Sequence, residues 1–264
     1  MKYLHDEVLK HYDSAKYTTP DGYTSDIALF TIISEKTEEK APPKMQLKMM
    51  LIKRAELDSE KRQNIEGGKW ALPGGFVNAE DKETALEAAR RELKEETNVE
   101  GLHIKHFAVY DQIDRDPRGW MISNAFYAIV PEEVLEERRA SDDAAEVELF
   151  GMDEVFALDL AFDHRQIIKE ALSLIKRELI TTTIARNFLP KEFTLSELQR
   201  VLLTVGDDPR ISNDSVFFTK APKLSFIEKV LELDGTPKKT NRHSFRPSQL
   251  YTFNNVEIME SIYH

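Results

Sequence analysis

The chain contains no cysteine among its 264 residues. This absence excludes disulfide scaffolds, thiolate metal sites, thiol nucleophiles and thiol-based redox switches. It also favours a cytoplasmic location, because small secreted domains often depend on disulfides. The sequence has no apolar run long enough for a membrane helix, and its first residues, MKYLHDEVLKHY, lack the apolar segment of a signal peptide. We therefore expect no membrane partner.

Positive charge is also scarce. The chain has 36 Lys and Arg against 47 Asp and Glu, for a formal net charge of −11, which disfavours nucleic acid overall. The imbalance is uneven, because residues 186–264 hold 11 Lys and Arg against 10 Asp and Glu and are nearly neutral. The length suits two domains, and the uneven charge indicates that the two have different roles.

The first part of the sequence predicts strands arranged around one strong helix. Strand-like segments occupy residues 26–34, 45–54, 103–110, 121–130 and 146–152. Residues 163–179 have apolar positions at helical spacing, with Asp163 as the expected N-cap. This order predicts an α/β sandwich on a mixed sheet, in a domain that we assign to residues 1–180.

Residues 181–264 predict a second, smaller domain. Residues 194–205 read as a helix, in which Thr194 and Glu197 form a capping box. An insertion of residues 206–224 follows, and residues 225–233 (SFIEKVLEL) read as a second helix. A basic turn over residues 238–246 then leads to a strand, SQLYTF. Two short helices followed by a basic hairpin are typical of a winged helix.

A helix with clustered carboxylates follows a Gly74-Gly75 pair. Thr84 and Glu87 predict its capping box, and Leu86, Ala89 and Leu93 predict the face that packs inward. Glu92, Glu95 and Glu96 share another face, where like charges cost roughly 0.2–0.5 kcal/mol per pair. An acidic face is usually only solvated, but such carboxylates also suit a hard divalent cation. The metal site is favoured by the acids in combination with the capping box, the Arg91-Glu92 pair and the glycine pair, which lets backbone approach a ligand or metal closely.

Residues 75–99 resemble the Nudix box, G-x5-E-x7-R-E-U-x-E-E-x-G-U, in which U is apolar. Glu83 is followed by seven residues and then RELKEETNV, but seven residues instead of five separate Gly75 from Glu83, and Asn98 replaces a glycine. Asparagine also tolerates a left-handed helix end. The longer loop leaves open whether Glu83, Asp81 or Glu80 takes the family position.

The resemblance implies Mg²⁺-dependent hydrolysis of a nucleoside diphosphate linked to another moiety, with Mn²⁺ as an alternative ion. It implies that Glu92 and Glu96 are the main metal ligands, that Glu95 is a ligand or base, and that Arg91 orients Glu92 and Glu83. These five residues are the expected catalytic set. Asp142, Asp143 and Glu146 offer a weaker candidate base in a later acidic loop.

The segment RDPRGW (residues 115–120) resembles the ADP-ribose-binding branch of the Nudix family. Arg118 is expected to bind phosphate and Trp120 to stack on a base, together with Gly74, Gly75 and Phe76 as substrate-binding residues. For Arg115 alone we favour a surface turn.

Most of the chain also resembles the Nudix-related transcriptional regulators of NAD metabolism, through LAFDHRQII, FLPKEFTLSELQRV and RPSQLYTF. Two hypotheses follow: a hydrolase of ADP-ribose or a related nucleotide sugar, or a repressor of NAD or sugar metabolism that responds to ADP-ribose. The resemblance also leads us to expect a homodimer.

Operator DNA would be contacted by basic residues of the C-terminal half. The candidates are Lys238, Lys239, Arg242 and Arg246 in the wing, with Arg210, Lys220 and Lys223 before it. A solvated hairpin in a protein–protein module explains the same residues about as well. Phe217, Phe218 and Tyr251 are expected in the core.

Overall fold

The computed structural model describes residues 10, 13–35, 43–57, 60–100, 103–132, 134, 135, 147–206 and 208–255. The acidic residues Asp142, Asp143 and Glu146, which the sequence offers as a catalytic base, lie outside these ranges.

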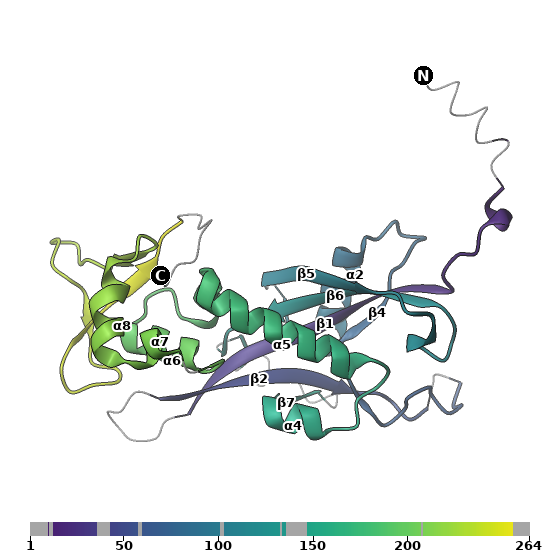
Figure 1. The fold of residues 1–264 in the computed structure, drawn as a ribbon, viewed down its shortest axis with the longest axis horizontal. Coiled ribbons are helices and arrows are strands. Elements are labelled where there is room, and N and C mark those ends of the chain that lie inside the picture. The colour runs from purple at the N-terminus through teal and green to yellow at the C-terminus, as the bar shows by residue number, and fades with distance from the viewer. Residues whose placement is uncertain are drawn as a thin grey trace.

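A seven-stranded mixed sheet forms the N-terminal part of the molecule (Figure 1). The order is β3-β2-β1-β6-β5, while β4 also pairs with β1 and β7 with β2. Strand β1 is parallel to β6 and the other described pairings are antiparallel, which confirms the predicted mixed sheet. The strands are β1 (Gly22–Glu35), β2 (Lys44–Lys53), β3 (Trp70–Ala71), β4 (Gly74–Phe76), β5 (His103–Tyr110), β6 (Met121–Ile129) and β7 (Val147–Gly151).

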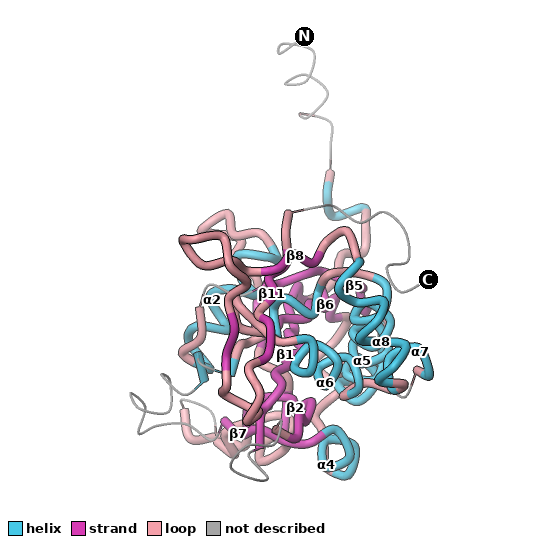
Figure 2. Tube along the Cα trace, turned by 90° about the vertical axis from the view of Figure 1, so that its left-hand side faces the viewer, coloured by secondary structure: helices cyan, strands magenta, loops and turns pink. Residues whose placement is uncertain are grey.

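Strand β1 is buried on both faces, and its alternate side chains enter two different hydrophobic clusters. Leu29 belongs to the cluster that contains Leu93 of helix α2 (Ala85–Thr97). Phe30 belongs to the cluster that contains Ile168 of helix α5 (His164–Thr181). Because successive strand residues point to opposite faces, α2 and α5 cover opposite sides of the sheet, as Figure 2 shows.

The C-terminal domain has the predicted winged-helix arrangement. It begins with η3 (Ile184–Phe188) and α6 (Leu195–Leu203), followed by α7 (Pro209–Ser212), α8 (Asp214–Lys220) and η4 (Ala221–Lys223). The strands β8 (Ile227–Lys229), β9 (Lys239–Thr240), β10 (Ser248–Gln249) and β11 (Tyr251–Phe253) then form the hairpins. The remaining short elements of the described chain are η1 (Ser14–Lys16), η2 (Ile113–Arg115) and α4 (Met152–Ala157).

The prediction of a helix over residues 225–233 is wrong. Residues Ile227–Lys229 form β8 and pair with β11, while Leu231 and Leu233 are exposed rather than packed on a helix face. The segment is short and contains β-branched Ile227 and Val230, so the gain from pairing with β11 decides its conformation. The helices that follow α6 are instead α7 and α8, both within the segment interpreted as an insertion.

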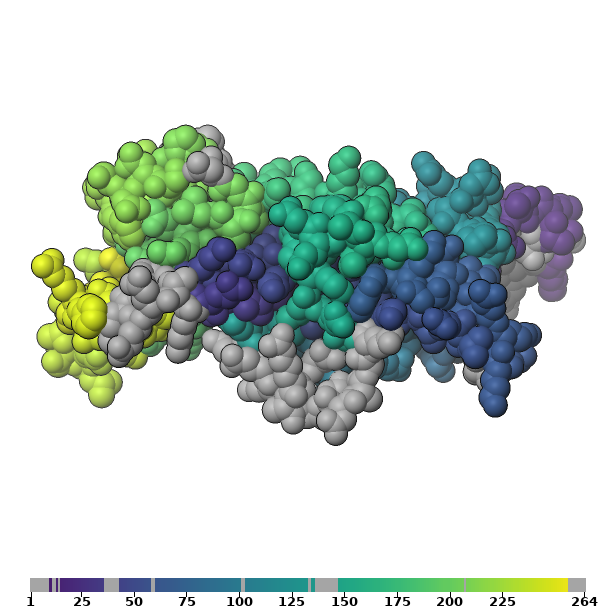
Figure 3. All heavy atoms as spheres, turned by 90° about the horizontal axis from the view of Figure 1, so that it is seen from below, coloured from purple at the N-terminus to yellow at the C-terminus, as the bar shows by residue number. Residues whose placement is uncertain are grey.

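The two domains share one hydrophobic cluster. It contains Phe30 and Met49 of the sheet, Ile168 of α5, and Leu198 and Val201 of α6. Helix α5 follows the sheet and leads into the C-terminal domain, which forms one end of an elongated molecule (Figure 3). The predicted domain division after residue 180 falls within the last turn of α5.

Within the described part of the chain, no helix combines the length and the apolar character needed to cross a bilayer.

Candidate active site

Helix α2 has the predicted ends. The Thr84 hydroxyl accepts a hydrogen bond from the Glu87 N–H, and the Glu87 carboxylate accepts one from the Thr84 N–H, so the capping box is confirmed. Asn98 ends the helix in the left-handed region, at φ 53°, and its N–H donates to the Lys94 carbonyl. The replacement of the family glycine by asparagine therefore preserves the helix end.

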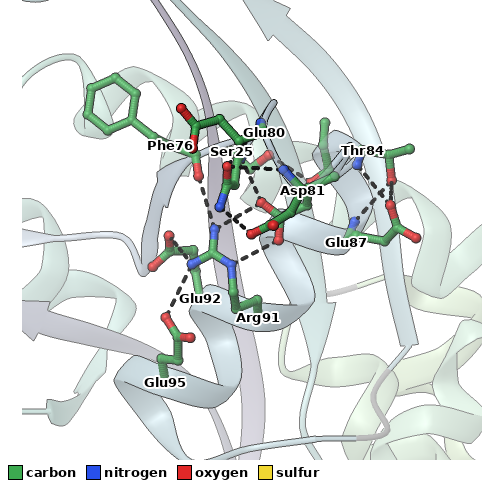
Figure 4. A network of polar contacts seen from close by, with 12 residues as sticks. Ser25, Phe76, Glu80, Asp81, Thr84, Glu87, Arg91, Glu92 and Glu95 are labelled. Carbon is green, nitrogen blue, oxygen red and sulfur yellow. Dashed lines mark hydrogen bonds and ion pairs between the residues drawn. The ribbon is translucent and has the colours of Figure 1, made fainter.

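Arg91 connects the acidic residues of this helix (Figure 4). Its guanidinium donates to both carboxylate oxygens of Glu83 at 2.8 and 3.0 Å, to Glu92 at 2.7 Å and to Glu95 at 3.2 Å. It also donates to the Phe76 carbonyl at 3.0 Å, which ties the helix to the end of β4. Arg91 and the Asn78 N–H hold the pKa of Glu83 below its usual value. Glu83, rather than Asp81 or Glu80, therefore occupies the position beside Arg91.

The longer loop after the glycine pair folds into a compact turn. The Asn78 N–H donates to Glu83 at 2.8 Å, and the Asn78 side chain accepts from the Glu80 N–H and donates to Asp81. Lys82 adopts a left-handed conformation with φ 58°. The additional residues are thus absorbed before Glu83, and its contact with Arg91 is preserved.

The Gly74-Gly75 pair is surrounded by carboxylates. The Gly74 N–H donates to Glu96 at 2.8 Å. A Cβ atom at Gly75 would lie 2.2 Å from a Glu92 oxygen, and one at Gly74 would lie 2.9 Å from an Asp26 oxygen. The glycines therefore permit a close approach of carboxylate side chains from β1 and α2, while the predicted approach to a ligand or metal stays a prediction.

The expected set of three metal ligands is not gathered around one point. Among the described residues, no group of three or more acidic or histidine side chains is spaced to hold a metal ion. The reason is Arg91, which binds both Glu92 and Glu95, and the Glu95 side chain is 58% exposed. The assignment of Glu92, Glu95 and Glu96 as metal ligands therefore stays a prediction.

Glu96 nevertheless has the character of a cation ligand. Burial raises its pKa to about 7, the Glu92 and Asp26 carboxylates add to the rise, and the Gly74 N–H opposes it. Within the described ranges, no Lys, Arg or His side chain forms an ion pair with it. Half-buried carboxylate oxygens that crowd a glycine pair fit a hard divalent cation, which would compensate their mutual repulsion.

A cavity of about 180 Å³ opens beside the glycine pair. Its walls come from β1, the end of β2, the β3–β4 turn, the loop between β5 and β6, and the start of α5. The lining residues are Thr24, Asp26, Arg54, Leu72, Gly74, Gly75, Phe76, Arg115, Asp116, Arg118, Phe162 and His164. The cavity thus joins predicted substrate-binding residues to several that were not predicted.

Arg118 and Trp120 have different positions. Arg118 lines the cavity, where it donates to the buried Asp116 at 2.6 Å and lies 5.3 Å from the Phe76 ring centre and 5.4 Å from that of Phe162. Trp120 donates from its indole nitrogen to the Asp111 carbonyl and is not part of the cavity lining. The structure therefore brings Arg118, but not Trp120, to the site.

Arg115 is not part of a surface turn. Its side chain is only 4% exposed and donates to Asp163 at 2.6 and 2.9 Å, while Asp26 lies 3.6 Å away. Asp163 therefore stands at the N-cap of α5 without capping it, because its carboxylate binds Arg115. The surface-turn interpretation fails because it considered Arg115 without its partner, which lies far along the chain.

Buried His164 supports the floor of the cavity. Its Nδ1 accepts a hydrogen bond from the Leu72 N–H at 2.9 Å, and its Nε2 lies 3.7 Å from Asp26. Burial lowers the pKa of His164 despite Asp26 and Asp163. A neutral ring with its proton on Nε2, directed toward Asp26, satisfies both contacts.

Sequence reasoning assigned no site role to Asp26, Arg54, Phe162 or His164. Phe162 and His164 fall within LAFDHRQII, which carried the resemblance but indicated no role for either residue. Asp26 and Arg54 lie at the ends of strand-like segments, where a charged residue gives no distinct signal.

The predicted DNA-binding residues divide into two groups. Lys238 binds Glu192 at 3.0 Å, and Arg242 binds the buried Glu197 and the Glu192 carbonyl, so both stabilise the domain. Lys239 and Arg246 are exposed, as are Lys220 at the end of α8 and Lys223 in η4.

Comparisons with known proteins agree with this geometry. The NUDIX domain model matches residues 24–171, more than half of the chain, and the model of the AraR C-terminal winged HTH domain matches residues 181–261. The ADPR responsive transcriptional repressor NtrR of Acinetobacter baylyi is 25% identical over 248 residues, covering 93% of this chain and 86% of that protein.

An ADP-ribose pyrophosphatase of Methanocaldococcus jannaschii is 43% identical over 123 residues, which are 47% of this chain and 64% of that protein. The crystal structure of Shewanella oneidensis NrtR shares the fold, with a TM-score of 0.69 and 23% identity over 90% of this chain and 99% of that one. The present chain therefore belongs to the Nudix family and joins a Nudix domain to a C-terminal winged helix-turn-helix domain.

Proposed function

We propose that this chain is a Mg²⁺-dependent hydrolase of ADP-ribose or a related nucleoside diphosphate sugar, with Mn²⁺ as an alternative ion. The main support for the proposal is that Arg91 binds Glu83 and Glu92. These residues lie beside Glu96, which accepts a hydrogen bond from the Gly74 N–H. A chain that only bound DNA would have no need for this costly cluster of carboxylates. The similarity to an ADP-ribose pyrophosphatase over the Nudix part supports the same activity.

Each residue of the cluster has a distinct role in this proposal. Glu92 and Glu96 would hold the ion at the glycine pair, where it would neutralise the diphosphate and lower the pKa of the attacking water. Arg91 fixes Glu92 and is itself oriented by Glu83, which binds it through two oxygens. Glu95 contributes to the orientation of Arg91 from the exposed side.

The neighbouring cavity supplies the charge that a diphosphate requires. Burial and the nearby Arg118 lower the pKa of Arg54, whose guanidinium donates to the Ile65 carbonyl. Two guanidinium groups that destabilise each other beside Gly74 and Gly75 would both gain from an anion placed between them. This arrangement favours a phosphorylated substrate over a neutral one.

The test is turnover of ADP-ribose to AMP and ribose 5-phosphate in the presence of Mg²⁺. We expect Glu96→Gln to reduce kcat at least about 100-fold, because the variant loses an anionic ligand at the glycine pair. Glu100→Gln is the matched control, since Glu100 follows the same helix, is 62% exposed and pairs with Lys94. A Glu96→Gln enzyme with the rate of the control would contradict the assignment.

A repressor function is the second candidate, favoured by the winged helix and by the similarity to an ADPR responsive repressor over 93% of the chain. We propose that α8 and η4 face operator DNA through Lys220 and Lys223, with Lys239 and Arg246 contacting phosphates. These four side chains are exposed.

This candidate is tested by selection of bound sequences from a random DNA pool, with and without ADP-ribose. We expect one sequence motif to be enriched, and ADP-ribose to release it. The double variant Lys220→Ala, Lys223→Ala should reduce the slope of log K against log salt by about 2, since each lost phosphate contact removes about 0.9. Lys229→Ala in β8 is the control. Absence of any enriched motif under both conditions would exclude this function.

A further inference from the structure

Phe162 has an unusual backbone conformation. Its φ is 48°, in the left-handed region that bulky residues rarely adopt. The chain is anchored on both sides of it, because the Ala161 N–H donates to the Trp70 carbonyl and the His164 ring accepts from the Leu72 N–H. These anchors hold Phe162 in a conformation that costs free energy, and such strain is typical of functional positions.

The Phe162 ring is not packed as a core side chain. It belongs to neither of the two hydrophobic clusters of the described chain, and it is only half-buried. Its ring centre lies 5.0 Å from the Arg54 guanidinium carbon and 5.4 Å from that of Arg118. The ring therefore projects into the cavity between two cationic groups, next to Gly74 and Gly75.

These planar groups form an alternating series. Arg54 lies against Phe162, Arg118 lies near both Phe162 and Phe76, and Phe76 is 47% exposed. Asp116 fixes the Arg118 guanidinium through two nitrogens. A planar heterocycle can stack on a π-face of this series. The phosphates attached to it can then accept hydrogen bonds from the edges of the two guanidinium groups.

We infer that Phe162 is the stacking platform for the nucleobase of the bound nucleotide, while Arg54 and Arg118 bind its phosphates. The inference rests on the proposed function, which supplies the nucleotide, and goes further by assigning the base to Phe162 rather than to Trp120. Packing of the ring against His164, whose ring centre is 5.6 Å away, is the purely structural alternative.

The variant Phe162→Asn separates the two explanations. Asparagine tolerates a positive φ but has no ring, so relief of strain offsets lost contacts in the free protein. We expect an unchanged or higher Tm, at least tenfold weaker binding of AMP and ADP-ribose by calorimetry, and binding of inorganic pyrophosphate within twofold of wild type. Phe162→Tyr, which keeps the ring, should bind AMP like the wild type.

Four results would overturn the inference. A lower Tm with unchanged AMP affinity would make the ring structural. An equal loss of AMP and pyrophosphate binding would mean that the ring only positions the arginines. If the wild-type protein binds neither AMP nor ADP-ribose, both the proposed function and the inference are contradicted. If the wild type binds nucleotide and the Phe162→Asn variant is equally active, only the inference is contradicted. Phe245→Asn, at an 82% exposed ring of the wing, is the control for loss of an aromatic side chain.

Discussion

Among single residues, Arg91 links the end of β4 to the carboxylates of Glu83 and helix α2. One guanidinium binds three carboxylates and the Phe76 carbonyl, and thereby fixes helix α2 relative to the end of β4. Such a planar group with several fixed donors cannot be replaced by an ammonium, which is a compact point charge. The geometry of the site therefore depends on guanidinium shape as well as on charge.

We expect Arg91→Lys to reduce ADP-ribose hydrolysis at least tenfold, because lysine cannot bind Glu83 through two nitrogens while it also holds Glu92. The change is measured as kcat under saturating substrate. Arg90→Lys is the matched control, since Arg90 is the preceding, exposed residue of the same helix. Equal rates for the two variants would show that Arg91 does not orient the site.

At this scale the sequence predicts local chemistry well and long-range pairing poorly. The roles of Thr84, Glu87 and Asn98 follow from spacing within one helix, and the structure confirms them. The partnership of Arg115 with Asp163 joins residues 48 positions apart, and no local pattern indicates it. Phe162 gives no signal either, because its left-handed conformation results from anchors on β3 and at the start of α5.

Among the secondary-structure elements, helix α6 is bonded to the wing through a residue of its N-terminal capping box. Glu197 completes the capping box with Thr194, and it also binds Arg242 and His243 of the wing. Its burial would raise its pKa, but the hydrogen bonds from Arg242 and Thr194 outweigh burial and lower it below the usual 4.5. The charged form of Glu197 therefore stabilises the folded domain.

The lowered pKa of Glu197 predicts that the free energy of unfolding depends on pH. Because the folded-state pKa of Glu197 is depressed, its stabilisation is fully present above the unfolded pKa near 4.5 and is lost as the pH falls through the folded pKa. We expect Glu197→Gln to reduce the free energy of unfolding by about 2 kcal/mol at pH 7, a typical value for hydrogen bonds to a charged group. The difference from wild type should shrink below pH 4.5.

Urea unfolding at pH 7 and at pH 3.5 measures both values. Glu192→Gln is the control, because Glu192 is 36% exposed and pairs with Lys238 at the surface, so its loss should cost less than about 1 kcal/mol at either pH. A Glu197→Gln deficit that persists undiminished at the lower pH would contradict the electrostatic explanation.

Elements also mark the limit of prediction from sequence. The start of α6 follows from Thr194 and Glu197, but the sequence predicts a helix where β8 lies, because this short apolar pattern fits both periods. Pairing with β11 decides between them, and this partner lies beyond the wing. The basic residues of the wing were predicted as a group, whereas the acidic partners of Lys238 and Arg242 were not.

In the whole molecule, the site gathers residues from distant parts of the chain. Asp26 comes from β1, Arg54 follows β2, Arg118 precedes β6, and Phe162 and His164 surround the start of α5. The same helix α5 contributes to the hydrophobic cluster that continues into the winged helix. The cavity beside the glycine pair and the C-terminal domain are therefore both connected to helix α5.

The proposed hydrolase activity is tested most directly by the turnover of ADP-ribose by the purified wild-type chain, followed by separation of the nucleotide products. We expect conversion to AMP and ribose 5-phosphate with Mg²⁺, and none when the ion is removed by chelation. No turnover of ADP-ribose or of any nucleotide sugar with Mg²⁺ or Mn²⁺ would contradict it.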